Sequence, residues 1–274
     1  MIWQPGDDQW ITVGGMRLEC RCWGPAPDAA PTLVLLHEGL GSTGLWKDFP
    51  QKLASRTGYG VFAYSRAGYG KSDPARLPRP LDYMTREAVE VLPIVLDAIG
   101  FRRGVLLGHS DGASIAAIHS GSVEDFRVRG LCLISPHFFT ELGGLAAIAK
   151  TNVQYETSNL RERLARHHPN VDNTFRGWND AWLAPGFRAW NIEEVIAYIR
   201  VPVLAIQGRD DQYGTLAQIE ALRSGLYAPL DTLILDGCKH SPHLERPDET
   251  QGAVSDFIAR LDRIEAVQLQ GMVA

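Results

Sequence analysis

The sequence lacks the features that mark several specialised classes of protein. No apolar run in its 274 residues approaches the roughly 20 residues that a transmembrane helix needs. Its 27 lysines and arginines are outnumbered by 32 aspartates and glutamates, and no long basic run occurs. This balance argues against a nucleic acid or an anionic membrane as the main partner. An apolar share of 45% and a charged share of 22% are ordinary for a globular protein, so disorder is excluded.

Cysteine is scarce, and no secretory signal is visible. Four cysteines do not suggest a disulfide scaffold, and we expect Cys20 and Cys22 to be reduced residues that point the same way from one strand. The first ten residues contain two aspartates and no cationic stretch, unlike a signal peptide. We therefore expect a cytoplasmic protein. Its oligomeric state is not evident from the sequence.

Strand-like and helix-length segments alternate along most of the chain. Trp10–Val13 and Met16–Trp23 flank Gly14 and Gly15, which indicates a hairpin. Apolar runs typical of strands buried on both faces follow at Thr32–His37, Val61–Tyr64, Val105–Leu107, Leu131–Ile134, Val201–Ile206 and Thr232–Leu235. Between them lie the helix-length segments Thr85–Ile99, Ala113–His119, Thr215–Leu226 and Thr250–Ile264. This alternation predicts an α/β fold with a doubly wound, mostly parallel sheet.

One segment departs from the alternation. From about 137 to 198 the pattern is helical and rich in aromatic residues, with no convincing buried strand. We predict a core domain of residues 1–136 and 199–274 and a helical cap of residues 137–198. Trp178 and Trp182 are four positions apart, so they share a helix face. They belong either to the core of this segment or to an apolar underside that lines a substrate pocket.

Two glycine motifs suggest different chemistries. Gly39 to Gly44 reads G-x-G-x-x-G, the pattern that binds the pyrophosphate of a dinucleotide. Here Glu38 would place a negative charge beside the pyrophosphate. The next helix begins late, with Asp48 as its N-cap, and the next strand ends without a carboxylate for the ribose. A dinucleotide-binding oxidoreductase is therefore an outside alternative, and we expect no cofactor.

The second motif, Gly108-His109-Ser110-Asp111-Gly112, reads G-x-S-x-G between a strand and a helix. This is the context of a nucleophile elbow, whose tight turn requires small residues two positions before and two after the nucleophile. Gly108 and Gly112 meet this requirement for Ser110. Asp111 does not meet it, because His109 would occupy a tight position. Ser110 is the candidate nucleophile, and His109 is more typical of a packing residue.

A serine nucleophile needs a histidine base oriented by a carboxylate. Two predicted strands downstream end in such residues, in the order acid and then histidine. The first ends near Asp210 and Asp211, and the second near His240, with His243 close by. Loops that follow the carboxyl ends of parallel strands are where ligands bind in such sheets.

With these motifs in order, the chain resembles an α/β-hydrolase from about residue 10 to 261. The segments that carry the resemblance are LVLLHEGLGS, YSRAGYGKSDP, LLGHSDGAS, VPVLAIQGRDDQYG and GCKHSPHLERPDE. The resemblance implies Ser110 as nucleophile, Asp211 as acid and His240 as base. It also implies an oxyanion hole from the backbone N–H groups of Gly39 and Asp111, and a helical cap inserted before the strand that bears the acid. His243 is then a pocket-edge or structural residue, and His167 and His168 are expected to be solvated. Arg66 and Ser72 fall in a loop that is usually structural.

Glu38 is the clearest departure from the family pattern, which usually reads His-Gly at the start of this loop. The additional side chain could move the oxyanion donor to Leu40. Its carboxylate either hydrogen-bonds a loop or contacts the substrate. We therefore regard Glu38, Leu40, Trp178 and Trp182 as candidate substrate-binding residues.

The function expected from these residues is that of a serine hydrolase. It would cleave an ester or thioester of a small-to-medium, largely apolar acid through an acyl-enzyme on Ser110, and no ligand cluster implies a metal. A carbon–carbon bond hydrolase or a cofactor-free perhydrolase would use the same triad. A catalytically silent ligand-binding protein of the same fold is the alternative from a different class.

Overall fold

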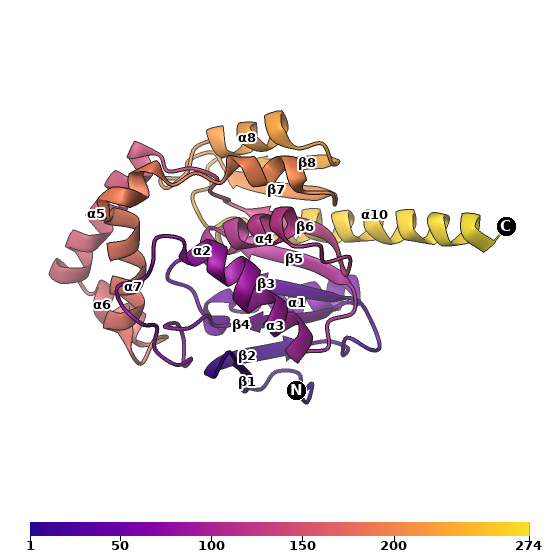
Figure 1. Ribbon diagram of the computed structural model, residues 1–274, viewed down its shortest axis with the longest axis horizontal. Coiled ribbons are helices and arrows are strands. Elements are labelled where there is room, and N and C mark those ends of the chain that lie inside the picture. Colours follow the sequence, from indigo (N-terminus) through magenta and orange to yellow (C-terminus); the bar gives the residue numbers. More distant parts are fainter. Residues whose placement is uncertain (274) are drawn as a thin grey trace.

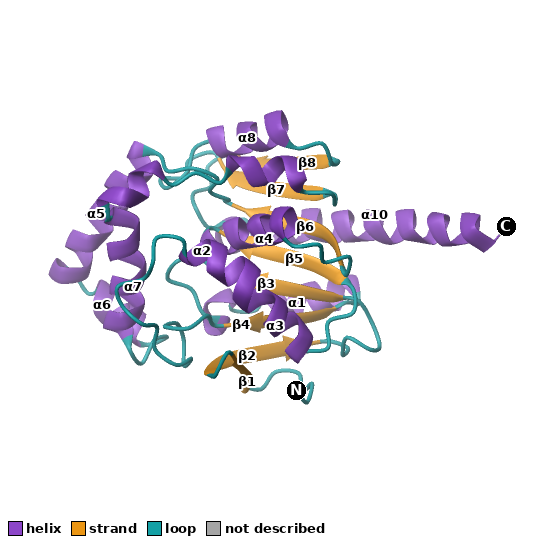
Figure 2. Ribbon diagram, viewed as in Figure 1, coloured by secondary structure: helices purple, strands orange, loops and turns teal. Residues whose placement is uncertain are grey.

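An eight-stranded sheet forms the centre of the molecule (Figures 1 and 2). The computed structural model describes residues 1–273, and the side chains of residues 1–267. The strands stand in the order β1-β2-β4-β3-β5-β6-β7-β8, and all pairs are parallel except β1 with β2 and β2 with β4. Their bounds are β1 (Gln9–Val13), β2 (Met16–Trp23), β3 (Thr32–Leu36), β4 (Gly60–Tyr64), β5 (Gly104–His109), β6 (Val128–Ile134), β7 (Val203–Gly208) and β8 (Leu230–Leu235). The predicted doubly wound, mostly parallel sheet is confirmed.

Helices cover both faces of this sheet, which is why its inner strands are mostly apolar. They are α1 (Phe49–Thr57), α2 (Tyr83–Arg86), α3 (Leu92–Ala98), α4 (Asp111–Ser122), α5 (Leu142–Thr157), α6 (Leu160–Ala165), α7 (Val171–Leu183), α8 (Ala217–Gly225), α9 (Pro242–Glu245) and α10 (Pro247–Val273). A π-helical turn, η2 (Glu87–Val91), joins α2 to α3, and 3₁₀ turns form η1 (Thr43–Trp46), η3 (Pro185–Ala189) and η4 (Glu193–Tyr198). One apolar core lies between the sheet and α3, α4 and α8, and another between the sheet and α1 and α10.

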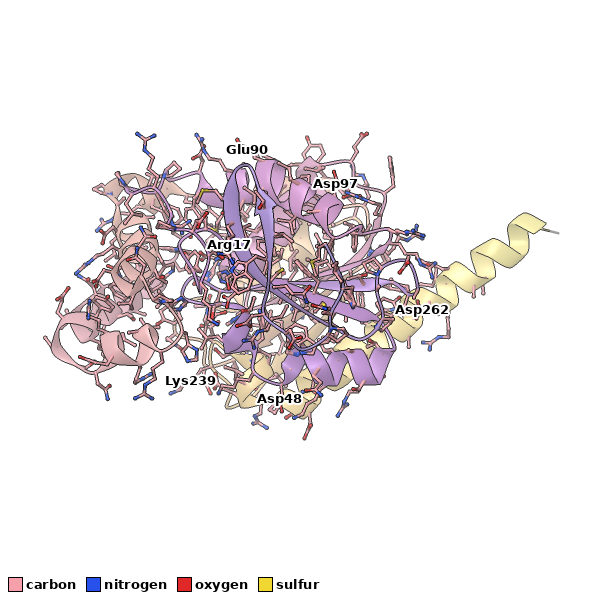
Figure 3. All side chains as sticks on the ribbon, turned by 90° about the horizontal axis from the view of Figure 1, so that it is seen from below. Arg17, Asp48, Glu90, Asp97, Lys239 and Asp262 are labelled. Carbon is pink, nitrogen blue, oxygen red and sulfur yellow. The ribbon has the colours of Figure 1, made fainter. Side chains whose placement is uncertain are left out.

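The last helix is longer than the sequence pattern predicts. We expected it over residues 250–264, but α10 begins at Pro247 and continues to Val273, and it extends beyond the body of the molecule (Figures 1 and 3). Near the point of departure, Asp262 accepts a hydrogen bond of 2.5 Å from the hydroxyl of Tyr59. The apolar spacing that predicts a helix ends where packing on the sheet ends, whereas helical hydrogen bonds need no such packing to continue. None of the helices in the described residues is long and apolar enough to cross a membrane.

The helices between β6 and β7 lie at one end of the sheet (Figure 1). A stacked pair, Tyr155 on α5 and Phe175 on α7, joins two of these helices with ring centroids 3.7 Å apart. Ile148 of α5 and Trp178 and Trp182 of α7 face the loops that follow the parallel strands. This segment therefore lies over the carboxyl ends of the strands, where the candidate catalytic residues also stand.

The turn between β5 and α4 is strained and tightly packed. Ser110 has φ 53° and ψ −119°, a conformation that residues other than glycine rarely adopt. A Cβ atom on Gly108 would lie 2.2 Å from the carbonyl oxygen of Gly112, and one on Gly112 would lie 1.9 Å from that of Leu36 in β3. Both glycines are thus required by close backbone contacts, as the G-x-S-x-G motif predicts.

We expect Gly112→Ala to lower the free energy of unfolding by about 3 kcal/mol, because the added methyl group must displace the backbone of β3. The matched control is Gly252→Ala in α10, where an added Cβ meets no atom within 4 Å and alanine favours the helix by up to about 1 kcal/mol. Urea denaturation of the two variants measures both effects. Equal stability of the two variants would contradict the packing argument.

Candidate functional site

The candidate residues converge on a cavity of about 170 Å³ at the carboxyl end of the sheet. Its lining combines polar groups from the five loops that follow β3, β5, β6, β7 and β8 with apolar side chains from α5 and α7: Glu38, Gly39, Leu40, Ser110, Asp111, His137, Ile148, Trp178, Trp182, Tyr213 and His240. All four candidate substrate-binding residues and both candidate oxyanion donors are among them. The acid Asp211 lies behind this lining, in contact with His240. Within the described residues no group of His, Cys, Asp or Glu side chains could hold a metal ion.

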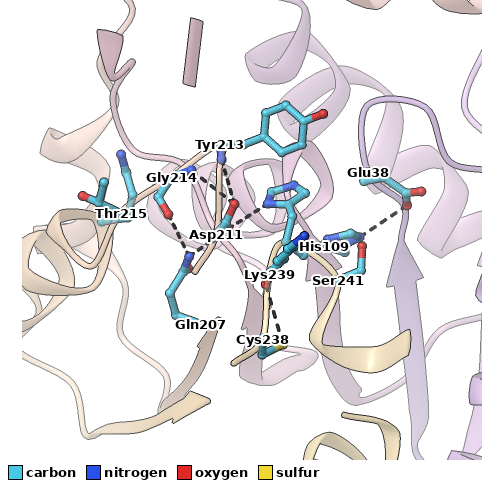
Figure 4. Close-up of polar contacts among 12 residues, drawn as sticks. Glu38, His109, Gln207, Asp211, Tyr213, Gly214, Thr215, Cys238, Lys239 and Ser241 are labelled. Carbon is cyan, nitrogen blue, oxygen red and sulfur yellow. Dashed lines mark hydrogen bonds and ion pairs between the residues drawn. The ribbon is translucent and has the colours of Figure 1, made fainter. Parts of the chain in front are cut away.

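Asp211 orients the imidazole of His240. The His240 Nδ1–H donates to Asp211 Oδ2 over 2.8 Å, and the amide of Gln207 donates to the same oxygen over 2.8 Å (Figure 4). The other carboxylate oxygen accepts from the backbone N–H of Tyr213 at 2.8 Å. Burial alone would raise the pKa of Asp211, but His240 and these hydrogen bonds lower it to about 2. The carboxylate is therefore charged at neutral pH and leaves Nε2 of His240 free to act as a base.

The neighbouring Asp210 lies differently. Its backbone is tied to the loop of His240 through a hydrogen bond to the carbonyl of Cys238, but the residue is exposed. The side chain of Asp211, in contrast, has no exposed surface. The geometry thus favours Asp211 over Asp210 as the partner of His240.

Ser110 and His240 line the same cavity, although no hydrogen bond within 3.5 Å joins their side chains in residues 1–267. In free enzymes the contact between a nucleophile and its base is often long.

The loop that follows β3 is held from behind by Arg66. The guanidinium of Arg66 donates to the carbonyl oxygens of His37 and Glu38, the second at 3.1 Å. His37 accepts from the Arg66 N–H at Nε2 (3.0 Å) and donates from Nδ1 to the Glu38 carbonyl (2.7 Å). Burial, and then the nearby Arg66 charge, keep the pKa of His37 well below its ordinary value, so this histidine is neutral. Arg66 is thus structural in its contacts, as expected.

This arrangement leaves backbone donors available beside Ser110. Asp111 is the first residue of α4, so its N–H has no partner in the helix. The N–H groups of Gly39 and Leu40 also donate no hydrogen bond to any residue whose contacts the structure describes. The indole of Trp178 packs directly on Gly39, where an added Cβ would lie 2.2 Å from Nε1. Gly39 and Leu40 both remain candidates for the donor opposite Asp111.

Glu38 contacts both a histidine and the cavity. Its Oε2 lies 3.4 Å from Nδ1 of His109, and 27% of its side chain is exposed (Figure 4). His109 is buried and donates from Nε2 to the carbonyl oxygen of His240 at 2.7 Å. Its ring packs against His243, which burial keeps neutral by holding its pKa well below the ordinary value. His243 is thus a buried packing residue at the back of the site.

The side chain of Asp111 lies in a buried polar network. Its Oδ2 accepts from the hydroxyl of Tyr83 at 2.5 Å, and this hydroxyl accepts from the indole N–H of Trp182 at 3.0 Å. Arg66 lies 4.0 Å from the same carboxylate oxygen. Burial raises the pKa of Asp111 despite this neighbouring positive charge. The network joins the start of α4 to α7.

The structure adds lining residues that motif reasoning missed and corrects one expectation. His137, Ile148 and Tyr213 line the cavity, but no role was predicted for any of them from the sequence, although Tyr213 lies just after Asp211 in the segment VPVLAIQGRDDQYG. His168 was expected to be solvated, like its exposed neighbour His167, but it is fully buried. It donates from Nε2 to the carbonyl of Leu40 at 3.0 Å and accepts from the N–H of Gly70 at Nδ1. The tertiary fold brings the turn between α6 and α7, which contains His168, onto the loop after β3, a contact that sequence periodicity cannot show.

Comparison with known proteins agrees with this geometry. Residues 33–252 match the alpha/beta hydrolase family, so the chain belongs to that family, and the resemblance seen in its motifs is confirmed. A proline iminopeptidase of Lactobacillus delbrueckii subsp. lactis is 30% identical over 93% of this chain and 99% of its own length. An enol-lactonase of Burkholderia xenovorans LB400 superposes with a TM-score of 0.70 at 21% identity, over 92% of this chain and 100% of the other. Naproxen esterase of Bacillus subtilis gives 0.69 at 20% identity, over 92% and 90%. The solved structures show the fold, and the family and its relatives support a hydrolase.

Because His137 is buried, its protonation should make the free energy of unfolding depend on pH. Burial, and then the nearby His240, lower the pKa of His137 to about 3, whereas an unfolded histidine titrates near 6.5. The unfolded chain therefore binds the proton first, and the free energy of unfolding falls as the pH drops through this window. Between pH 7 and pH 5.5 we expect the free energy of unfolding of the wild type to fall by about 1 kcal/mol more than that of His137→Phe, which has no histidine to protonate at this position.

Urea denaturation at the two pH values measures this difference. His167→Gln is the matched control because His167 is exposed, and it should lose the same stability as wild type. If His137→Phe also matches wild type, His137 is not held neutral by the fold.

Proposed function

We propose that this protein is a serine hydrolase that cleaves a carboxylic ester or thioester of a small-to-medium, largely apolar acid. The observation that carries the proposal is the convergence of Ser110, on its strained turn, with the Asp211–His240 pair at one cavity. Ser110 attacks the substrate carbonyl, His240 accepts the serine proton and returns it to the leaving group, and Asp211 holds the imidazole. Water then cleaves the acyl-enzyme.

The oxyanion of the tetrahedral intermediate would be stabilised by backbone donors. The Asp111 N–H at the start of α4 and an N–H of Gly39 or Leu40 are the groups without a partner among the described contacts beside Ser110. Donors that are already oriented before the reaction stabilise the transition state without reorganisation. Arg66 supports this arrangement by holding the backbone of the loop from the opposite side.

The cavity supports a small apolar acyl group. A volume of about 170 Å³ is below the roughly 300–1,000 Å³ of pockets for drug-sized ligands. Ile148, Trp178 and Trp182 supply apolar walls. We propose that residues 137–198 act as a cap over a core of residues 1–136 and 199–274, because these three side chains come from its helices α5 and α7.

A second candidate is the hydrolysis of an amide next to a small N-terminal residue. The 30% identity to a proline iminopeptidase favours it, as does the carboxylate of Glu38 at the cavity, which could pair with a free amino group. If the protein is an ester hydrolase, it should prefer short p-nitrophenyl esters. If it hydrolyses an amide next to a small N-terminal residue, it should prefer proline p-nitroanilide. Relative kcat/KM on the two substrates distinguishes the candidates.

We expect a fluorophosphonate probe to form one adduct with the wild-type protein and none with Ser110→Ala, because Ser110 lies at the same cavity as the Asp211–His240 pair that would activate it. Ser255→Ala removes a serine on α10 that is bonded within its own helix, and it should be labelled like wild type. Intact mass measures the adducts. A folded wild-type protein without an adduct would contradict the serine mechanism and favour a silent binding protein.

Asp211→Asn should lower kcat on a short p-nitrophenyl ester by about 10⁴-fold, because an amide does not hold the imidazole in the required tautomer. The matched control is Asp210→Asn, which changes the adjacent exposed carboxylate and should stay within about twofold of wild type. Steady-state kinetics on both variants measures the effect. A large loss in Asp210→Asn with a small one in Asp211→Asn would reassign the acid.

A further inference from the structure

A second carboxylate and a second histidine lie behind the Asp211–His240 pair. His109 is buried between two loops, that of residues 37–41 and that of His240. Its Nε2 lies 2.7 Å from the carbonyl oxygen of His240, and its Nδ1 lies 3.4 Å from Oε2 of Glu38 (Figure 4). The rings of His109 and His240 have centroids 5.0 Å apart. The side chain of His109 thus bridges the loop with the candidate oxyanion donors and the loop with the candidate base.

Proton counting constrains the state of this bridge. A carbonyl oxygen only accepts hydrogen bonds, so the proton of a neutral His109 must be on Nε2. Its Nδ1 would then present a lone pair to the carboxylate of Glu38, a repulsive contact. One further proton between Nδ1 and Oε2 turns this contact into an attraction between opposite charges.

The surroundings indicate where that proton resides. Burial raises the pKa of Glu38, but its contact with His109 outweighs burial and lowers the pKa below its ordinary value, so the carboxyl is ionised. The other titratable groups near the pair are His37, His168, His240, His243 and Lys47. Burial keeps His37 and His243 neutral, and His168 already donates to Leu40 and accepts from Gly70. Among the described residues, the ring nitrogen of His109 is the cationic partner that lies within 4 Å of the Glu38 carboxylate, so the geometry points to His109 as the carrier of the proton.

We propose that Glu38 and His109 form a second carboxylate–imidazole pair that positions the base His240 through its backbone. In this arrangement Asp211 orients the ring of His240, while the charged His109 holds its main chain and Glu38 holds His109. The pair also ties the position of the base to the loop that carries Gly39 and Leu40. The inference rests on the proposed function, because it assigns the pair a positioning role for His240 in that reaction. Neither residue contacts the reacting atoms in this role.

Nitrogen-15 NMR of protein labelled in histidine tests the pair without any substrate. The His109 signals are assigned by their loss in His109→Gln. At pH 7 we expect protons on both ring nitrogens of His109 in the wild type and on Nε2 alone in Glu38→Gln. A His109 with one proton in the wild type, unchanged by Glu38→Gln, would overturn the proposal.

Kinetics of fluorophosphonate labelling test the positioning role. We expect Glu38→Gln and His109→Gln each to slow labelling by about 10- to 100-fold, because a small misplacement of a catalytic group costs about that much. The double variant should be no slower than the slower single variant, because the two residues act as one unit. His167→Gln, at an exposed position, is the control and should label at the wild-type rate.

Steady-state kinetics separate positioning from substrate binding by Glu38. On a neutral p-nitrophenyl ester, loss of positioning lowers kcat and leaves KM nearly unchanged. If Glu38→Gln instead changes only KM, and chiefly for substrates that carry an amino group, Glu38 binds substrate and the positioning role is wrong. Failure of wild type to label at Ser110 would reject the proposed function, while the NMR experiment would still decide whether the pair exists.

Discussion

The close approach of the first turn of α4 to the end of β3 is the constraint on which the site depends. Gly112 lies against the carbonyl oxygen of Leu36, and this contact places Ser110 at the carboxyl end of the sheet in a strained conformation. The same contact sets the loop after Leu36 beside the start of α4. The candidate nucleophile and the backbone donors of Gly39, Leu40 and Asp111 are thus positioned by one packing interaction between α4 and β3, the parallel neighbour of the strand β5 that leads into α4.

Around this contact, buried charges are placed so that each has a partner of opposite sign or a hydrogen bond. Arg66 holds the carbonyls of the loop after β3 and lies near the carboxylate of Asp111, which Tyr83 also binds. Asp211 is charged because His240, Gln207 and backbone N–H groups compensate for its burial. Since unpaired buried charges are costly, these networks also define the relative positions of the loops. The same contacts therefore hold the loops of the site in place and balance its buried charges.

Much of this could be predicted from the sequence because the signals are local. Each signal is set by the local structure of a few consecutive residues: the apolar runs of the inner strands, the small residues around Ser110 and the polar residues directly after two strands. The choice between Asp210 and Asp211 depended on a resemblance, and the geometry now favours Asp211 because its side chain is buried against His240. The length of α10 was underestimated because the helix extends beyond the body of the molecule (Figure 1), whereas the sequence pattern marks a helix by the apolar face that packs on a core.

The sequence by itself thus determined the alternation of strands and helices and the class of the sheet. It predicted Ser110 and His240 as candidate catalytic residues, whereas the choice of Asp211 as the acid followed from the family resemblance. Only the tertiary structure decided that His168 is buried on Leu40, that His137 and Tyr213 line the cavity, and that His109 lies between Glu38 and the backbone of His240. The contacts of His168 and His109 join residues about 70 to 130 positions apart. Local periodicity and turn chemistry carry no information about such pairs, because their energies arise only when the sheet brings separate loops to one edge.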